Sequence, residues 1–364
     1  MVGCLTGDTF DFKLIVMIRL ICISLICVQQ VSVFAQSPKK GRLVTEKLTS
    51  EVLRENRIGL DPNRTIKIYL PPGYEGTKKS YPVVYYFQSM FTPVEQVFDN
   101  GVVSLLERAF SEGVSREFIF VAADYSSPTV GSLYENSPVS GRWIDFTVNE
   151  LVPFIDSKFR TLKQRDSRAV VGHFMGGRGA LKMVMSHAET FGVAYALHPV
   201  ATGNGYSPWS LISLDWKKVF AAKTFDEVGN ARIFVAVGQA FLPNLDRPPF
   251  YANFMFEPDA QGEPRPNPEN IIKSKAGFHL EESLIESASN LRSLRGLAFD
   301  WARFDGNQDH VYSNETFSRK LYDLGIPHEG EEYNGDPWSK VWVPDGRFYN
   351  RTLPFFQKHL VFSD

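Results

Sequence analysis

The stretch VVGHFMGGRGAL at residues 170–181 constrains the fold more than any other part of this chain. An apolar, valine-rich run passes directly into a segment in which Gly172, Gly176 and Gly177 surround Phe174. Glycines at this spacing allow the backbone to approach closely where a strand turns sharply into a helix. The stretch therefore predicts a buried strand, a tight turn with Phe174 at its apex, and a helix behind it.

The rest of the chain alternates between strand-like and helix-like patterns, which is typical of a sheet covered by helices. Strands are predicted at 65–74, 82–87, 118–124, 168–173, 231–237, 294–301 and 328–333, and helices at 142–159, 314–324 and 350–360. Several strands are continuously apolar, which indicates parallel neighbours buried on both faces. Pro153 is expected to kink the first helix. The predicted fold class is α/β, with a mostly parallel central sheet flanked by helices.

The segment 242–270 breaks this alternation. It is crowded with proline, asparagine and aromatic residues and shows no period. A long irregular loop inside a compact domain is usually a lid or a binding segment, and Phe250, Phe254 and Met255 would need an apolar surface to cover. A lid-like insertion and a surface excursion without a role both fit the pattern.

Charge and cysteine content exclude several classes of function. The net charge of −2 arises from 39 basic and 41 acidic residues mixed along the chain, so no nucleic-acid partner is expected. The three cysteines, Cys4, Cys22 and Cys27, all lie in the first thirty residues. No disulfide framework or thiolate metal site is therefore available to the rest of the chain.

Residues 1–35 have the pattern of a signal peptide. Arg19 precedes an apolar stretch, and small residues ending at Ala35 form a cleavage pattern, so a secreted or periplasmic protein is predicted. A membrane anchor is the alternative, but the apolar run is short and interrupted by glutamines, so no transmembrane span is expected after removal of the leader. Residues 36–60 are then an N-terminal extension and 61–364 a single domain. The start could equally be Met17.

Five blocks follow one another in order over roughly residues 60–360: YLPPGY, YPVVYYF, LYENSPVSGRWIDFTVNELVPFIDSKFRTL, SRAVVGHFMGGRGALKMVMSHAETFGVAYALHP and YDLGIPHEGEEYNGDPWSKVW. They resemble consecutive blocks of the esterase D-like family, which includes secreted members. The resemblance implies an α/β-hydrolase fold and hydrolysis of carboxylic esters. It also implies a serine nucleophile at a strand-to-helix turn and a histidine base held by an acid.

The chain departs from this family at both the nucleophile and the base. Phe174 occupies the serine position of the G-x-S-x-G turn, and its ring has neither a lone pair for attack nor a proton to give up. The family pattern Y-x-G-D-H reads Tyr333-Asn334-Gly335-Asp336-Pro337 here, so Pro337 stands at the histidine position. His328 and His359 are interpreted as structural or surface residues. The ring of Phe174 is expected to lie in the cleft beneath the segment 242–270.

The resemblance places the acid in the loop DWARFDGNQDH, at Asp305 or Asp309, with Asp305 preferred. Asp305 precedes a glycine, so it is also typical of a turn. His310 resembles a histidine that members of the family also carry, and it is therefore not interpreted as a replacement base.

An oxyanion hole needs two backbone donors, which the resemblance assigns to Met175 and to the loop containing Gln88. That loop reads Phe-Gln-Ser-Met where many hydrolases have His-Gly, so its geometry is an open question. Ser89 is interpreted as a loop serine that caps its own backbone. His198 replaces a small serine expected from the family and alters the floor of the same region.

Loss of both the nucleophile and the base favours a non-catalytic descendant of an exported esterase. Such a protein would keep the cleft to bind or present a small-molecule ester, an acylated carbohydrate or a partner chain. The alternative is an active serine-type carboxylesterase that uses repositioned groups. The sequence has no H-E-x-x-H motif and no P-loop, so neither a metal nor another cofactor is expected.

Overall fold

The computed structural model describes residues 1, 3, 40–90, 92–99, 101–205 and 214–363. The chain divides into two units, Met1–Lys39 and Lys40–Asp364. The predicted signal peptide, apart from residues 1 and 3, lies outside the described residues, so the fold is that of the second unit.

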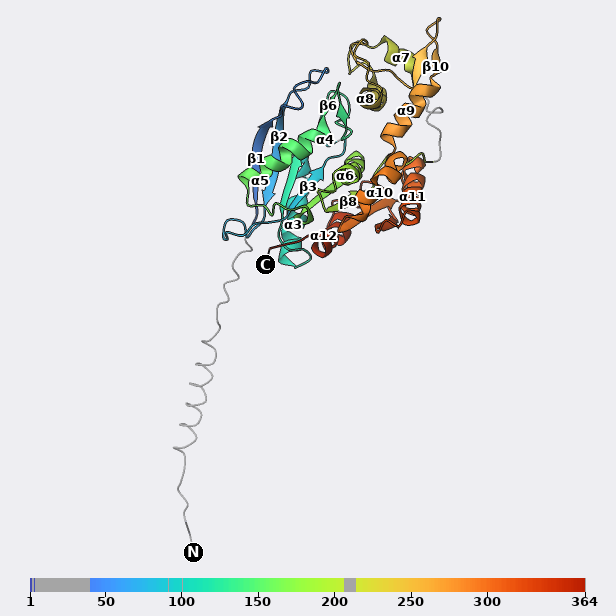
Figure 1. Ribbon diagram of the computed structural model, residues 1–364. Coiled ribbons are helices and arrows are strands. Elements are labelled where there is room, and N and C mark those ends of the chain that lie inside the picture. Colours follow the sequence, from blue (N-terminus) through green and yellow to red (C-terminus); the bar gives the residue numbers. More distant parts are fainter. Residues whose placement is uncertain (2, 4–39, 91, 100, 206–213, 364) are drawn as a thin grey trace. The chain divides into compact units, whose positions relative to one another are not determined.

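An eight-stranded sheet forms the centre of this unit, in the order β1-β2-β4-β3-β7-β8-β11-β12 (Figure 1). Its strands are β1 (Arg42–Thr49), β2 (Asn63–Leu70), β3 (Val83–Phe87), β4 (Ile119–Ala123), β7 (Arg168–His173), β8 (Val193–Leu197), β11 (Gly296–Ala302) and β12 (Glu329–Tyr333). The strands from β4 to β12 are parallel, whereas β1 and β2 are antiparallel to their neighbours. The predicted α/β fold class with a mostly parallel sheet is confirmed.

The sequence predicted that residues 36–60 are an extension, but the described part of this range, residues 40–60, belongs to the domain. Strand β1 pairs with β2 along its whole length, from Arg42 opposite Leu70 to Thr49 opposite Asn63. Only alternate side chains of β1 are partly covered, which is the pattern of an edge strand. Because polar and apolar residues are mixed in β1, the sequence did not indicate a strand here.

Helices cover both faces of the sheet because its strands are apolar on both sides. Val83, Tyr85 and Phe87 of β3 pack into one core, and Val84 and Tyr86 pack into the other. The first core includes side chains of α5 (Val152–Lys158), α6 (Met175–Ser186), α10 (Leu284–Arg292) and α11 (Gln308–Asp323), and the second those of α3 (Val102–Ser111) and α12 (Leu353–His359). No helix among the described residues is long and apolar enough to cross a membrane.

The helix predicted at 142–159 is present but is not uniform. It consists of α4 (Trp143–Asp145), a π-helical turn (Phe146–Leu151) and α5. Pro153 lies at the start of α5, directly after the π-helical turn, so the helix departs from regular α-helical geometry next to the proline. The remaining predicted helices correspond to α11 and α12.

The strand predicted at 231–237 is wrong, because these residues begin the helix α8 (Arg232–Phe241). A short apolar run without a clear period is compatible with either structure. Here the run is apolar because the helix is buried on two sides. Val235 packs with Trp216 and Phe254 in one cluster, and Val237 packs with Phe174 in another.

The segment 242–270 has more structure than a loop and does not cover the site. It contains the hairpin of β9 (Phe256–Pro258) and β10 (Pro264–Pro266) and the start of α9 (Pro268–Phe278). Phe250, Phe254 and Met255 pack with α7 (Trp216–Ala221) and α8 in a small separate core. The aromatic residues of the segment thus support α8, and side chains of α8 and of the end of α9 line the site.

Candidate active site

Phe174 lies at the apex of the turn between β7 and α6, with φ 58° and ψ −115°. Its N–H donates to the Leu197 carbonyl at 3.0 Å. A Cβ at Gly172 would lie 2.0 Å from the Gly176 carbonyl oxygen, and one at Gly176 would lie 1.9 Å from that of Phe87. The glycines are therefore required by close backbone contacts. A bulky residue at this positive φ costs on the order of 1–3 kcal/mol.

The ring of Phe174 lies in the cleft and is 8% exposed. It contacts His198 (centroids 6.0 Å apart, planes 8°), His310 (5.2 Å, 88°) and Trp338 (5.0 Å, 37°). These residues lie in three different segments, which follow β8, β11 and β12 at the carboxyl ends of those strands. The ring is thus packed as expected, but against an aromatic cluster and not beneath the segment 242–270.

Pro337 belongs to the turn that follows β12, and its carbonyl accepts a hydrogen bond from His173 Nε2 at 2.8 Å. The next residue, Trp338, extends its indole over Phe174 and His173. Where the family resemblance implies a histidine, this chain therefore brings a tryptophan to the apex. Neither His328 nor His359, which the sequence assigned to structural roles, lines the cavity at the apex.

Asp305 is bonded to two imidazoles. Its Oδ2 accepts hydrogen bonds from His198 Nε2 at 2.8 Å and His310 Nδ1 at 2.7 Å, and its Oδ1 accepts from the Asn307 N–H at 2.8 Å. Burial raises the pKa of Asp305, but these hydrogen bonds outweigh burial and hold the pKa well below its usual value. The group is therefore an ionised acceptor. Asp309 lines the cavity.

The hydrogen-bond partners assign the proton positions of the two histidines. His198 Nδ1 accepts from the Ala302 N–H at 2.9 Å, so the proton is on Nε2 and is donated to Asp305. His310 must carry its proton on Nδ1, because its partner there is an ionised carboxylate. Its Nε2 then holds a lone pair, which faces the Asn307 amide at 3.1 Å. The two rings are therefore opposite tautomers.

His198, Asp305 and His310 also form a cluster of metal-ligand type, with their ligand atoms within 4.8 Å of one another. The sequence predicted no metal site. A metal-bound histidine normally donates its second ring N–H to an acceptor. His198 instead accepts the Ala302 N–H, and the nitrogen that faces the cluster carries the proton. The hydrogen bonds therefore suit a metal-free network better than a metal site.

The two oxyanion candidates, Met175 and Gln88, lie side by side. Met175 is the first residue of α6, so its N–H has no acceptor within the helix. The close packing of Gly176 on the carbonyls of Phe87 and Gln88 holds the two loops together. Among the described residues, neither Gln88 Oε1 nor Ser89 Oγ has a hydrogen-bond partner, although both atoms are buried. The sequence suggested that Ser89 caps its own backbone, but its hydroxyl makes no such hydrogen bond.

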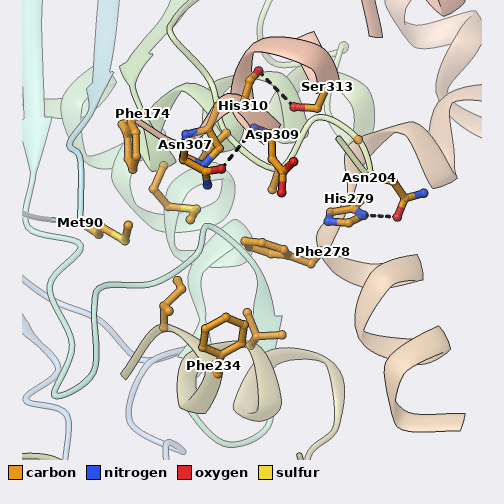
Figure 2. Close-up of a pocket in the computed structure, with 16 residues that line it drawn as sticks. Met90, Phe174, Asn204, Phe234, Phe278, His279, Asn307, Asp309, His310 and Ser313 are labelled. Carbon is orange, nitrogen blue, oxygen red and sulfur yellow. Dashed lines mark hydrogen bonds between the residues drawn. The ribbon is translucent and has the colours of Figure 1, made fainter. Parts of the chain in front are cut away.

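A cavity of about 310 Å³ adjoins the Phe174 ring (Figure 2). Its apolar lining is Met90, Phe174, Met175, Val200, Ala201, Ile233, Phe234, Val237 and Phe278, and its polar lining includes Asn204, His279, Asn307, Asp309, His310 and Ser313. The sequence analysis missed the contribution of α8 because those residues were interpreted as a strand. The run of Ile233, Phe234 and Val237 was visible, but only the fold places it opposite the apex.

The buried histidines predict a loss of stability in mild acid. Burial lowers the pKa of His173 and of His279 to about 4, whereas an unfolded histidine titrates near 6.5. Between these values the unfolded chain binds protons that the folded chain does not, so stability falls as the pH falls. We expect each histidine to lower the free energy of unfolding by about 2 kcal/mol between pH 7 and pH 4.5.

Urea denaturation of the wild type, His173→Gln and His279→Gln at both pH values measures this effect. Each variant should show a smaller difference between the two pH values than the wild type, whatever its absolute stability. If a variant and the wild type lose the same stability between the two pH values, the replaced histidine binds its proton in the folded protein as readily as in the unfolded chain.

Comparison with known proteins supports the fold and identifies the family. The profile of a family described as "Putative esterase" matches residues 59–247, which is about half of the chain. An esterase of Mycobacterium tuberculosis is 33% identical over 146 residues, covering 38% of this chain and 29% of that protein. The chain thus matches less than a third of that relative's length. An uncharacterised protein of Bacillus subtilis is 23% identical over 201 residues, covering 51% of this chain and 71% of that protein.

Solved structures with the same fold include a ferulic acid esterase, with a TM-score of 0.61 and 20% identity, covering 88% of this chain and 99% of that chain. An S-formylglutathione hydrolase from Agrobacterium tumefaciens has a TM-score of 0.54 and 14% identity, covering 89% of this chain and 98% of that chain. Such identities establish the fold alone. With the profile match, they show that this chain belongs to the esterase family and has the α/β-hydrolase fold of carboxylic ester hydrolases.

Proposed function

We propose that this protein is a non-catalytic member of its family that binds a small acylated ligand in the cleft beside Phe174. The observation that carries the proposal is the phenylalanine at the apex of an otherwise intact turn. The strained backbone that presents a nucleophile is kept, but the side chain presented has no atom that can attack a carbonyl. The turn thus presents a packed aromatic ring where an active member of the family presents a nucleophile.

The cavity next to the ring supports binding of an apolar group. Its volume of about 310 Å³ falls at the lower end of small-molecule sites, which measure roughly 300–1,000 Å³. Ile233 and Val237 of α8 line it together with Phe174 and Phe278, so an acyl chain or a ring would be enclosed by hydrocarbon. Asn204 and His279, which bond to each other at 3.1 Å, provide a polar end.

A second, smaller cavity supports an ester-like ligand with a polar arm. It measures about 150 Å³ and shares Met90 and Met175 with the first. It contains Gln88 and Ser89, whose buried oxygens lack partners among the described residues. A buried oxygen without a partner costs about 1–3 kcal/mol, so a ligand hydroxyl that bonds to it would be favoured. None of the described residues that line this cavity is charged, which favours a neutral, hydroxyl-bearing group such as part of a carbohydrate.

Two assays on the wild-type protein test the absence of catalysis. We expect no turnover of 4-nitrophenyl acetate above that of a heat-denatured sample, and no labelling by a fluorophosphonate probe. Turnover that the fluorophosphonate inhibits would contradict the proposal and favour the alternative, a serine-type carboxylesterase with repositioned groups. The Asp305–His310 hydrogen bond is the observation that keeps this alternative open.

Calorimetric titration with ferulic acid tests the binding site directly. One of the structures with this fold is described as a ferulic acid esterase in complex with ferulic acid. Ile233→Trp should fill the cavity and weaken binding at least 10-fold, whereas Ile285→Trp, on the surface of α10 at 81% exposure, should leave it unchanged. Equal affinities for the two variants would place the ligand elsewhere.

We also propose that the protein is exported, on the basis of the leader pattern that ends at Ala35. Mass spectrometry of the protein recovered outside the cytoplasm should give a chain that begins near Gln36. A chain that keeps residues 1–35, or that carries a lipid on Cys22 or Cys27, would contradict cleavage at this position.

A further inference from the structure

The residues around Phe174 include a histidine that the family pattern does not use as a base. His310 lies in the first turn of α11, and its ring is roughly perpendicular to the Phe174 ring, with the two centroids 5.2 Å apart. Its Nδ1 donates to Asp305 at 2.7 Å. A general base in a serine hydrolase has the same arrangement, with one nitrogen bonded to an acid and the other carrying the lone pair.

Several independent contacts fix His310 in this state. The carboxylate of Asp305 is held ionised by His198 and by the Asn307 N–H, so it accepts the proton of His310 Nδ1 and cannot donate one. The Asn307 side chain accepts the Asp309 N–H through Oδ1, which directs its amide hydrogens to His310 Nε2. The lone pair of His310 therefore lies on Nε2, where, among the residues that the structure describes, it accepts a 3.1 Å hydrogen bond from the Asn307 amide.

From these contacts we propose that Asp305 and His310 form an intact acid–base pair that serves position 174. The chain would then lack only the nucleophile, and Phe174→Ser alone would create an ester hydrolase. This inference rests on the proposed function in one respect, that the wild type has no nucleophile of its own. His198 acts as a positioning residue. Its Nε2 donates to Asp305, while its Nδ1 accepts the Ala302 N–H.

The reaction in the variant follows from the geometry. A serine side chain is shorter than the phenylalanine ring, so one water in the vacated space displaces the Asn307 amide from His310 Nε2 and bridges that nitrogen to Oγ. The Oγ–carbonyl carbon bond forms while the Oγ proton passes through this water to Nε2. The ester C–O bond then breaks, and the alcohol leaves with that proton. A second water attacks the acyl-serine, again giving a proton to Nε2, and that proton returns to Oγ as the carboxylic acid departs.

The experiment compares Phe174→Ser with Phe174→Ala, which opens the same space without a hydroxyl. We expect Phe174→Ser to hydrolyse 4-nitrophenyl acetate and to label with a fluorophosphonate, and Phe174→Ala to do neither. Adding His310→Gln to Phe174→Ser should reduce turnover by roughly 100-fold, within the range of general-base effects. A folded Phe174→Ser that is no more active than Phe174→Ala, or whose turnover does not depend on His310, would overturn the inference.

Pro337→His provides a direct comparison with the family arrangement. If the base must come from position 337, only Phe174→Ser combined with Pro337→His would be active, and that result would also overturn the inference. Turnover by the wild type would instead contradict the proposed function, so the two failures are distinguishable.

A measurement on the wild type keeps the inference testable if Phe174→Ser does not fold. Long-range proton–nitrogen NMR spectra of ¹⁵N-labelled histidines distinguish the two tautomers. We expect His310 to carry its proton on Nδ1 and His198 on Nε2. A proton on Nε2 of His310 would leave it without the lone pair that a base needs, and would overturn the inference.

Discussion

Replacing Arg178 by methionine should lower the free energy of unfolding by about 3–5 kcal/mol, because it leaves a buried carboxylate without its partner. Arg178 is fully buried on α6 and pairs with Glu135 at 2.8 Å. Its other hydrogens go to the carbonyls of Leu133, Gly277 and Phe278. The last two end α9, so this side chain also joins the helix behind the apex to the wall of the cavity.

The double variant Arg178→Met, Glu135→Leu is the matched control for this effect. It removes both charges, so it should recover part of the stability lost in the single variant, because apolar residues often replace a buried pair at little cost. Urea denaturation measures both, and hydrogen exchange over 268–278 reports whether α9 loosens. A single variant within 1 kcal/mol of the wild type would show that Glu135 finds other partners, such as Lys182 at 3.6 Å.

The parallel core of the fold was predictable because its signal is local. Strands such as β3 and β7 are buried on both faces, so each appears in the sequence as a continuous apolar run. The helix α8 gave a similar run for another reason, since it lies between two clusters of apolar side chains. Local pattern alone cannot distinguish a buried strand from a helix buried on two sides. Because α8 was predicted as a strand, the helix against which the aromatic residues of 242–270 pack was not recognised.

The sequence predicted individual site residues only where a local motif identifies the position of a catalytic residue in the family. Phe174 was found because the glycine-rich turn after β7 identifies its place in the sequence. Pro337 was found because it follows the segment of β12 at a fixed spacing. The hydrogen bonds that join His198, Asp305 and His310 were not, since His198 and Asp305 are 107 residues apart and meet only when β8 and β11 pair. The same applies to the tautomers, which depend on the Ala302 N–H and the Asn307 amide.

Phe174→Ala and Phe174→Gly should reverse the usual order of stability at a buried position. Removal of the ring should lower the free energy of unfolding by about 3 kcal/mol in Phe174→Ala, the low end for phenylalanine, because the ring already borders a cavity. Glycine in place of alanine normally costs further stability within regular structure. At φ 58°, however, glycine alone escapes the backbone penalty that alanine shares with phenylalanine.

We therefore expect Phe174→Gly to be more stable than Phe174→Ala by about 1 kcal/mol, measured by urea denaturation of both variants under the same conditions. This comparison separates the two roles of the residue, since both variants lack the ring and only one keeps the strain. If alanine were the more stable, the turn would relax once the ring is gone. The strain would then be imposed by the packing of Phe174 against His198, His310 and Trp338, and not by the glycines that surround it.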